Sequence, residues 1–407
     1  MKFIKTILIG LLTLVFSLTL FSNGLNLNGI GSKSVGMGGA FIGLADDFSA
    51  VYWNPAGLTQ MKQTNVGIFG TDIIPKGTYT LSAYGIDAET ESKMYPSGAL
   101  GFFKPISDKL VVGFLAYVPS GSGATWNGDD LKILTANVAF EWESMVAMVT
   151  FSPAIAYKIS ESLSVGATLN ISYGMLNIKQ PALGQYSEEL TGTTFGATFG
   201  VMFKPSKKFS IGISVKTPQK VSVEGKAEMG LAAIYGLPTT ATATREMTWP
   251  LWLGAGIAFK PNEKLTFTFD VQYTKWSELA KVEVSYDNQF WNAYFANGAE
   301  FDLKWDDTIQ IRAGMEYKIN DKFALRMGVY KDPAPSPLET LNILLPNVDF
   351  LSFAFGFGYT TDKINLDFAV EYLKGSDREV PLGDEYAMPG VHGMSIVVPN
   401  ISLTIKF

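Results

Sequence analysis

The sequence predicts an all-β protein: a closed transmembrane antiparallel β-barrel of 14 strands that holds an N-terminal plug in its lumen. Three observations predict this fold. A short turn motif recurs along the chain, alternation of apolar and polar residues flanks each copy, and a glycine-rich segment near the N-terminus lacks that alternation.

The first residues have the features of a secretory signal. Lys2 and Lys5 precede an apolar run over residues 7–20, which is followed by small residues suited to cleavage. We therefore expect residues 1–23 to be a signal peptide. Later segments lack the eighteen or so consecutive apolar residues of a membrane helix. A membrane-spanning chain of this kind must form a closed barrel, because only helices and barrels satisfy every backbone polar group in lipid.

Residues 24–62 are predicted to form the plug. The stretch from Gly36 to Leu58 is rich in glycine and alanine and contains the turn-forming run Asn54-Pro55-Ala56-Gly57. A flexible linker is the plain alternative. The glycines around Gly38 also imitate a dinucleotide-binding loop, but such a loop lies inside a βαβ unit, and no alternation of strands and helices follows. We favour short helices in the lumen of a barrel.

A turn motif divides the rest of the chain, residues 63–407, into hairpins. The motif begins with an aromatic residue, which is usually followed by Lys and then by Pro or Ile. Polar residues come next, and then Lys or Ser and an apolar residue complete the motif. Close copies occupy residues 157–163, 203–209, 259–265 and 317–323, and looser copies occupy 103–110 and 359–364. The six turns join twelve strands.

Each copy is flanked by strands with one apolar face. After the first close copy, for example, Leu163 and Val165 alternate with Ser164. A further strand begins near Asn65 and a last one ends at Phe407, which brings the number to fourteen. The segments between the hairpins are longer and irregular. This asymmetry is typical of outer-membrane barrels, which have short periplasmic turns and long extracellular loops.

Composition agrees with a membrane barrel and disfavours other classes. The chain has no cysteine, which removes disulfides, thiol catalysis and cysteine-ligated metals. Its net charge of −6, without a basic tract, is unsuited to binding nucleic acid. A secreted β-sandwich would show the same alternation, but the polar faces here carry mostly small residues that cannot fill a wide lumen. A barrel of this width needs a separate plug or must conduct.

An enzymatic function is disfavoured by the shortage of catalytic groups. The single histidine, His392, is expected in a solvated loop without a nucleophile motif nearby. The paired aspartates at 46–47, 129–130 and 306–307 lack the spacing of a calcium loop. We therefore expect no reaction, no metal and no cofactor.

Three predicted extracellular segments are unusually apolar: residues 131–140, residues 229–237 and an aromatic cluster at 290–295. They either pack on one another as a cap or form a groove that binds hydrophobic molecules. A water-filled porin would instead line its entrance with charge. The candidate ligand-binding residues in these segments are Leu131, Leu134, Phe140, Leu231, Ile234 and Tyr235.

Two arginines on the polar faces of neighbouring strands are further candidates. Arg312 and Arg326 are expected to face the lumen. Arg326 either pairs with Glu316 across a hairpin or binds a substrate carboxylate, and we favour the ion pair. The run Pro119-Ser120-Gly121 is predicted to end the third strand, because proline donates no ladder hydrogen bond and glycine tolerates a bend.

The plug segment carries a resemblance to a known family. Gly36-Met37-Gly38-Gly39-Ala40, Ala45-Asp46-Asp47 and Asn54-Pro55-Ala56-Gly57-Leu58 resemble the N-terminal hatch of the FadL/TodX outer-membrane transporters. The resemblance spans the whole chain in architecture, but only the hatch motif is specific in sequence. It implies that the hatch residues are Gly36, Gly38, Gly39, Asp46, Asp47, Asn54, Pro55 and Ala56.

The resemblance implies passive uptake of hydrophobic compounds by a monomer in the outer membrane, surrounded by outer-membrane lipids. In that family an inward kink in the third strand opens the wall laterally, which makes Pro119, Ser120 and Gly121 the expected lateral opening. The terminal Phe407 resembles the signal read by the barrel assembly machinery. Long-chain fatty acids are the expected substrates, and aromatic hydrocarbon uptake or a non-specific porin are the alternatives.

Overall fold

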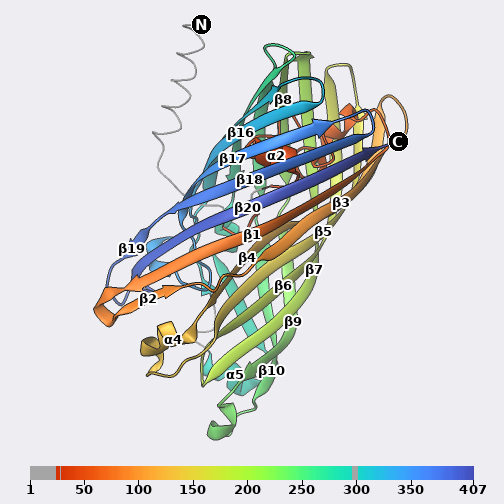
Figure 1. Ribbon diagram of the computed structural model, residues 1–407. Coiled ribbons are helices and arrows are strands. Elements are labelled where there is room, and N and C mark those ends of the chain that lie inside the picture. The colour runs from red at the N-terminus through yellow and green to blue at the C-terminus, as the bar shows by residue number, and fades with distance from the viewer. Residues whose placement is uncertain (1–23, 28, 296–300) are drawn as a thin grey trace.

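The computed structural model describes residues 24–27, 29–295 and 301–407 (Figure 1). The expected signal peptide, residues 1–23, lies outside them. The described strands form one antiparallel sheet that closes on itself, because β1 (Asn65–Leu81) pairs with both β3 (Tyr95–Pro105) and β20 (Gly390–Lys406). In this described part, no helix is long and apolar enough to cross a membrane.

Within the described residues, fourteen strands complete the ring, so the predicted fold is confirmed. In order around the barrel they are β1, β3, β4 (Leu110–Trp126), β5 (Trp142–Lys158), β6 (Leu163–Pro181), β7 (Gln185–Ser206), β8 (Phe209–Lys216), β11 (Trp252–Phe259), β12 (Leu265–Thr274), β15 (Thr308–Lys318), β16 (Phe323–Asp332), β17 (Asp349–Thr360), β18 (Ile364–Ser376) and β20. The six turn motifs join neighbouring strands at one end of the barrel.

Additional strands and short helices lie toward the opposite end, which carries the long loops (Figure 1). There β9 (Gln219–Met229) follows β8 after Pro218, and β10 (Thr240–Trp249) precedes β11 across Pro250. Proline cannot donate a ladder hydrogen bond, so it interrupts a strand at these points. The other described elements there are β2 (Ile86–Glu89), β13 (Lys281–Tyr286), β14 (Phe301–Asp302), β19 (Arg378–Val380), the α-helices α4 (Gly128–Leu131) and α5 (Gln289–Tyr294), and the 3₁₀ helices η2 (Ser82–Tyr84), η3 (Lys132–Thr135), η4 (Ala232–Tyr235), η5 (Trp276–Leu279) and η6 (Leu338–Thr340).

The outer surface of the ring is apolar. In β11 exposed and buried residues alternate without interruption. Large side chains such as Phe195 on β7 and Phe355 on β17 are 64% and 59% exposed. A water-soluble sandwich would bury such side chains between its sheets, whereas a barrel in lipid presents them to the hydrocarbon.

The described residues of the predicted hatch, 24–27 and 29–62, lie inside the barrel toward the short-turn end (Figure 1). It contains α2 (Ser32–Gly36), α3 (Ala50–Trp53) and the 3₁₀ helix η1 (Pro55–Gln60). Its apolar side chains pack with lumen-facing residues of the wall in one buried cluster that includes Phe41, Phe48 and Trp53. The short helices favoured from the sequence are therefore present.

Glycines of the wall allow the hatch backbone to lie directly against the strands. A Cβ atom added to Gly328 on β16 would lie 2.0 Å from the Gly38 nitrogen, and one added to Gly212 on β8 would lie 2.1 Å from the Ile42 oxygen. An added Cβ would come within 3.1 Å of a hatch backbone atom at five further wall positions. We call all seven the glycine belt: Gly166, Gly200, Gly212, Gly256, Gly314, Gly328 and Gly356.

Replacing a belt glycine by alanine should displace the hatch without unfolding the barrel. In Gly328→Ala the new methyl group meets backbone that cannot rotate away, and overpacking of this kind costs about 1–3 kcal/mol. We expect faster proteolysis of residues 24–62 in the folded, purified variant. Gly174→Ala on β6 is the matched control, because its nearest contact would be an ordinary 3.7 Å. Equal cleavage rates in both variants would contradict the role of the belt.

Candidate functional site

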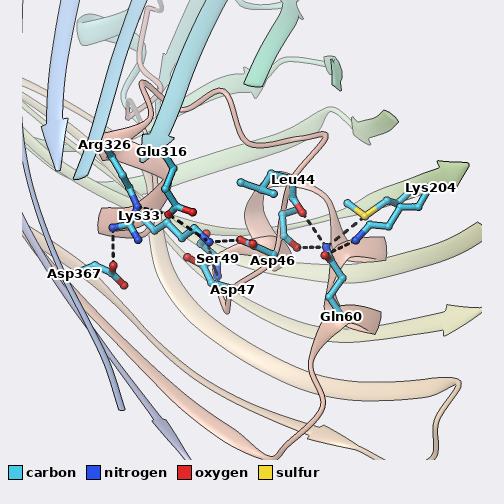
Figure 2. A network of polar contacts seen from close by, with 12 residues as sticks. Lys33, Leu44, Asp46, Asp47, Ser49, Gln60, Lys204, Glu316, Arg326 and Asp367 are labelled. Carbon is cyan, nitrogen blue, oxygen red and sulfur yellow. Dashed lines mark hydrogen bonds and ion pairs between the residues drawn. The ribbon is translucent and has the colours of Figure 1, made fainter. Parts of the chain in front are cut away.

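An ionic network fastens α2 of the hatch to the strands β15, β16 and β18 of the wall (Figure 2). The Lys33 ammonium lies 2.7 Å from Asp46 and 3.9 Å from Glu316 on β15. Arg326 on β16 donates to Glu316 at 2.8 Å and to Asp367 on β18 at 2.6 Å. Arg326 thus forms the favoured ion pair, and its guanidinium serves to hold the wall beside the hatch.

The two aspartates of the hatch motif have opposite electrostatic environments. Burial disfavours charge on Asp46, but the attraction of Lys33 outweighs it and lowers the pKa of Asp46 to about 2. Burial raises the pKa of Asp47 to about 6, although hydrogen bonds from the Ser49 amide (2.8 Å) and hydroxyl (2.5 Å) oppose the shift. Asp46 is therefore a fixed anion, whereas Asp47 titrates near neutral pH.

Asp270 and Arg312 are among the wall residues that bind the hatch backbone directly. One carboxylate oxygen of Asp270 on β12 accepts from the amides of Phe41 and Ile42 at 2.8 and 2.9 Å. Arg312 on β15 donates to the Gly38 carbonyl at 3.0 Å. The contact of Arg312 follows from its predicted lumen-facing position. Asp270 was missed, and the signal that could have found it is a lone carboxylate on the polar face of an alternating strand.

Asn54 joins the hatch to itself and to the wall. Its side-chain amide donates to the carbonyls of Ile42 and of Val201 on β7, both at 3.0 Å. Its side-chain oxygen accepts from the Ala56 amide at 3.2 Å, while Pro55 occupies the first position of η1. Figure 2 shows a further hydrogen bond within the hatch, in which the Gln60 side-chain amide donates to the Leu44 carbonyl at 2.8 Å. The segment between α2 and η1 is thereby held in one arrangement.

The wall has a window on one edge of β4. Backbone pairing of β3 with β4 ends at Ala99 and Tyr117, and the next backbone bridge to β4 on this side joins Thr90 to Trp126. Residues 118–124 of β4 therefore lack β3 as a partner. On its other edge, β4 contains one extra residue relative to β5 between Tyr117 and Ser120, which is a β-bulge.

The run Pro119-Ser120-Gly121 lies at this bulge, but the prediction that it ends the third strand was wrong. The β4 strand continues to Trp126, because its pairing with β5 resumes at Ser120. The bulge absorbs the proline, which needs no ladder donor there.

The N-terminal end of the hatch pairs with the edge that β3 leaves free. The Leu27 amide donates to the Pro119 carbonyl, and the Gly121 amide donates to the Leu25 carbonyl, both at 3.0 Å. The Ser120 hydroxyl adds a 3.2 Å hydrogen bond to the Asn26 side chain. The Pro119 carbonyl and the Gly121 amide thus find their partners inside the lumen.

A cavity of about 340 Å³ connects the lumen with the window. On the wall side it is lined by Tyr95 and Ser97 of β3 and by Ser122 and Gly123 of β4. On the lumen side it is lined mainly by apolar residues, namely Phe350 of β17, Leu373 of β18, and Ile396 and Val398 of β20. Two carboxylates also line it, Asp332 of β16 and Glu371 of β18.

A smaller cavity, of about 50 Å³, holds two cationic side chains beside Pro119 and Ser120. They are Arg312 and Lys216, which ends β8. The Lys216 ammonium lies 3.3 Å from the centre of the Tyr52 ring and 4.4 Å from that of Trp252. Sequence reasoning missed Lys216, although its place on the polar face of an alternating strand was a usable signal.

The predicted apolar loop residues do not gather in one groove. Leu134 contributes to a cavity of about 840 Å³ at the long-loop end, together with residues such as Tyr84 and Leu382. Leu131 is fully buried beneath it, and Phe140 is half-buried. The residues of the second loop project outward, with Leu231, Ile234 and Tyr235 exposed by 46%, 74% and 66%.

The expectation that His392 lies in a solvated loop was wrong. Strand β20 already begins at Gly390, so His392 is inside the ladder opposite Tyr79 and only 2% of it is exposed. Its ring packs 4.9 Å from the Tyr79 ring, and Nε2 lies 2.9 Å from the Met388 carbonyl. Among the described residues, no group of three or more His, Cys, Asp or Glu side chains could hold a metal ion.

Comparisons with known proteins agree with this architecture. The profile of the outer membrane protein transport protein family (OMPP1/FadL/TodX) matches residues 13–392. Outer membrane protein P1 of Haemophilus influenzae is 22% identical in an alignment of 415 positions that covers 87% of each chain. A FadL homologue from Pseudomonas aeruginosa superposes with a TM-score of 0.80 at 16% identity, covering 95% of this chain and 100% of its own. The toluene transporter TodX of Pseudomonas putida gives 0.77 at 16% identity, covering 94% and 99%.

Lowering the pH should stabilise the docked hatch by protonating Asp47. Its pKa in the folded protein lies above the ordinary value of 3.8, so protonation favours the docked hatch. The stability of the hatch therefore rises as the pH falls from about 6 towards 4. Hydrogen exchange of hatch amides, corrected for intrinsic rates, should slow several-fold between pH 7 and pH 5.

Asp47→Asn is the control for this prediction and should abolish the pH dependence. Asp46 does not interfere, because its contribution is lost only as the pH falls from about 4 towards 2. Exchange that is independent of pH in the wild-type protein would contradict the assignment to Asp47.

Proposed function

The chain belongs to the outer membrane protein transport protein family (OMPP1/FadL/TodX), and from this premise we propose that it takes up long-chain fatty acids passively across the outer membrane. Members of this family are transport channels for hydrophobic compounds, and we propose that this chain likewise catalyses no reaction. The observation that carries the proposal is the window between β3 and β4, with a largely apolar cavity behind it.

Capture takes place at the long-loop end. The cavity of about 840 Å³ there is lined by Tyr84, Leu134 and Leu382 among others. An apolar, concave surface removes hydrocarbon from water and is the usual form of a small-molecule site. The exposed Ile234 and Tyr235 add apolar surface on the neighbouring loop. A porin entrance lined by charge would not favour such molecules.

Release takes place laterally, through the window into the bilayer. Each methylene contributes about 0.8 kcal/mol to the preference for an apolar medium. A chain of a dozen methylenes would lose about 10 kcal/mol on entering the periplasm directly. The hatch blocks that direct route, since it packs against the wall along the glycine belt.

The window lies at the level of the lipid-facing surface. Ser120 pairs with Met148, and the neighbouring Val149 pairs with Tyr173 on β6, which is 43% exposed on the outer face. A substrate that leaves between β3 and β4 therefore enters hydrocarbon rather than water. We propose that Pro119, Ser120 and Gly121 form the edge of this exit.

The choice of a fatty acid over a hydrocarbon rests on the two cations of the small cavity. In the described part of the chain, no carboxylate lies within 4.0 Å of the Lys216 ammonium. A substrate carboxylate there would gain a charge-assisted hydrogen bond. Aromatic hydrocarbons are the second candidate, because Tyr52, Trp53 and Trp252 surround the same cavity. We also propose that the protein is a monomer and that the exposed Phe407 contacts the assembly machinery.

Removing the extra residue of β4 should block uptake. Between the pairs Tyr117–Thr150 and Ser120–Met148, β4 has two residues and β5 has one. Deletion of Pro119 leaves one residue on each strand, so β4 can pair without a bulge and return to the wall. We expect cells that lack other fatty-acid transporters to take up radiolabelled oleate at a strongly reduced rate. Oleate binding to the purified variant should persist, because the lumen is otherwise unchanged.

Pro119→Ala is the matched control, since it removes the proline but keeps the extra residue, and it should take up oleate normally. Uptake at the wild-type rate by the deletion variant, with closure of the window verified by structure, would exclude lateral exit.

Removing the charge of Lys216 should weaken binding of the acid selectively. Lys216→Met keeps the apolar stem but cannot donate a charge-assisted hydrogen bond, which is worth about 1.5–3 kcal/mol. We expect at least roughly tenfold weaker binding of oleate by calorimetry and unchanged binding of its methyl ester. Lys226→Met, at an exposed residue of the long-loop end that pairs with Glu228, is the control. Equal affinities of the wild-type protein for acid and ester would favour the hydrocarbon alternative.

A further inference from the structure

The turn motif carries a feature that transport does not use, namely its lysines. Within the described residues, thirteen lysines lie in the six turns and at the adjoining ends of β1 and β20. Nine are exposed and four are half-buried. The exposed ones are Lys62, Lys104, Lys109, Lys207, Lys208, Lys264, Lys318, Lys322 and Lys363, and the half-buried ones are Lys158, Lys204, Lys260 and Lys406. We call this set the lysine rim.

The lysine rim is strongly positive, although the whole chain has a net charge of −6. The same turns carry five acidic side chains: Asp108, Glu161, Glu263, Asp321 and Asp362. Among the described residues, only the pair of Lys158 with Glu161, at 2.7 Å, joins a rim lysine to a carboxylate within 4.0 Å. Lys204 instead donates to Gln60, and Lys406 donates to Asn365 at 2.8 Å. The exposed members therefore hold charge that the protein itself does not neutralise.

Lysines at the long-loop end are in a different situation. Most lysines there have carboxylate partners: Lys76 pairs with Glu89 at 2.8 Å, Lys132 with Asp129 at 3.3 Å, the half-buried Lys179 with Glu141 at 2.6 Å and Lys220 with Glu246 at 2.5 Å. Among the described residues, the exposed Lys374 near the end of β18 is an exception. The positive charge without internal partners is thus concentrated at one end of the barrel.

Aromatic residues place the lysine rim at the membrane interface. In four turns, the residue before the first lysine is an aromatic that faces outward: Tyr157, Phe203, Phe259 and Tyr317 are 40–45% exposed. Aromatic belts of this kind lie at the level of the lipid headgroups. A lysine that follows such a residue, or that lies a few residues away in the same turn, reaches the phosphate region with its flexible side chain.

From this arrangement we propose that the lysine rim binds the headgroups of anionic glycerophospholipids, such as phosphatidylglycerol, in the leaflet that surrounds the short-turn end. Each lysine near an anionic lipid surface contributes attraction that decays within a Debye length. The rim therefore selects its surrounding lipid by charge and holds the barrel at a fixed depth and tilt. This inference is independent of the identity of the transported compound.

The test compares lipid binding by two variants that each lose four positive charges. The rim variant is Lys207→Gln, Lys208→Gln, Lys264→Gln and Lys322→Gln. The control variant is Lys76→Gln, Lys132→Gln, Lys220→Gln and Lys226→Gln, at the long-loop end. Each folded, full-length protein in detergent is mixed with equimolar phosphatidylglycerol and phosphatidylcholine of identical acyl chains, and bound lipid is counted by native mass spectrometry.

We expect roughly threefold or greater enrichment of phosphatidylglycerol on the wild-type and control proteins, and none on the rim variant. The enrichment should disappear in 1 M salt, added before transfer to the volatile buffer. Equal binding of both lipids by the wild-type protein, or a rim variant that keeps its preference, would overturn the proposal. Binding of soluble peptidoglycan fragments without a preference for phosphatidylglycerol would assign the lysine rim to the cell wall instead.

Discussion

The hydrogen-bonded ring of the wall is the constraint on which the rest of the molecule depends. Backbone amides and carbonyls in lipid need partners inside the protein, and a closed ladder supplies them on both edges of every strand. The one edge of β4 that leaves the ladder takes its partners from Leu25 and Leu27. Part of the edge at the window therefore keeps hydrogen-bond partners, and the chain that supplies them is the end of the hatch itself.

Hydrogen bonds such as those of Asp270 and Asn54 are joined by two further kinds of contact that hold the hatch and act differently. The glycine belt lets backbone meet backbone, so the position of residues 36–57 is fixed by shape. The ionic network of Lys33, Glu316 and Arg326 adds little net stability once the desolvation of its members is counted, but loss of one partner would leave a buried charge. We infer that steric fit determines the position of the hatch. The ionic network disfavours arrangements in which its groups are separated, because a buried charge would then lack a partner.

Much of the fold could be predicted because it depends on local signals. The turn motif and the two-residue alternation gave the number of strands, and the lack of alternation placed the hatch. What escaped prediction depends on long-range pairing. His392 is buried because β20 extends further than expected, and the bulge at Pro119 is visible only against β5. Asp270 and Lys216 were missed because a polar side chain on an alternating strand shows that it faces the lumen, not what it meets there.

Six of the seven belt glycines stand at a fixed distance from the turns; Gly328, five residues after Phe323, is the exception. Gly166 and Gly212 each follow the first residue of their strand by three positions, and Gly200, Gly256, Gly314 and Gly356 each precede the aromatic residue of their turn by three. Three residues of strand correspond to about 10 Å. In a related sequence without a structure, counting three residues from each turn would therefore show whether the barrel has room for an internal domain and at what height that domain sits.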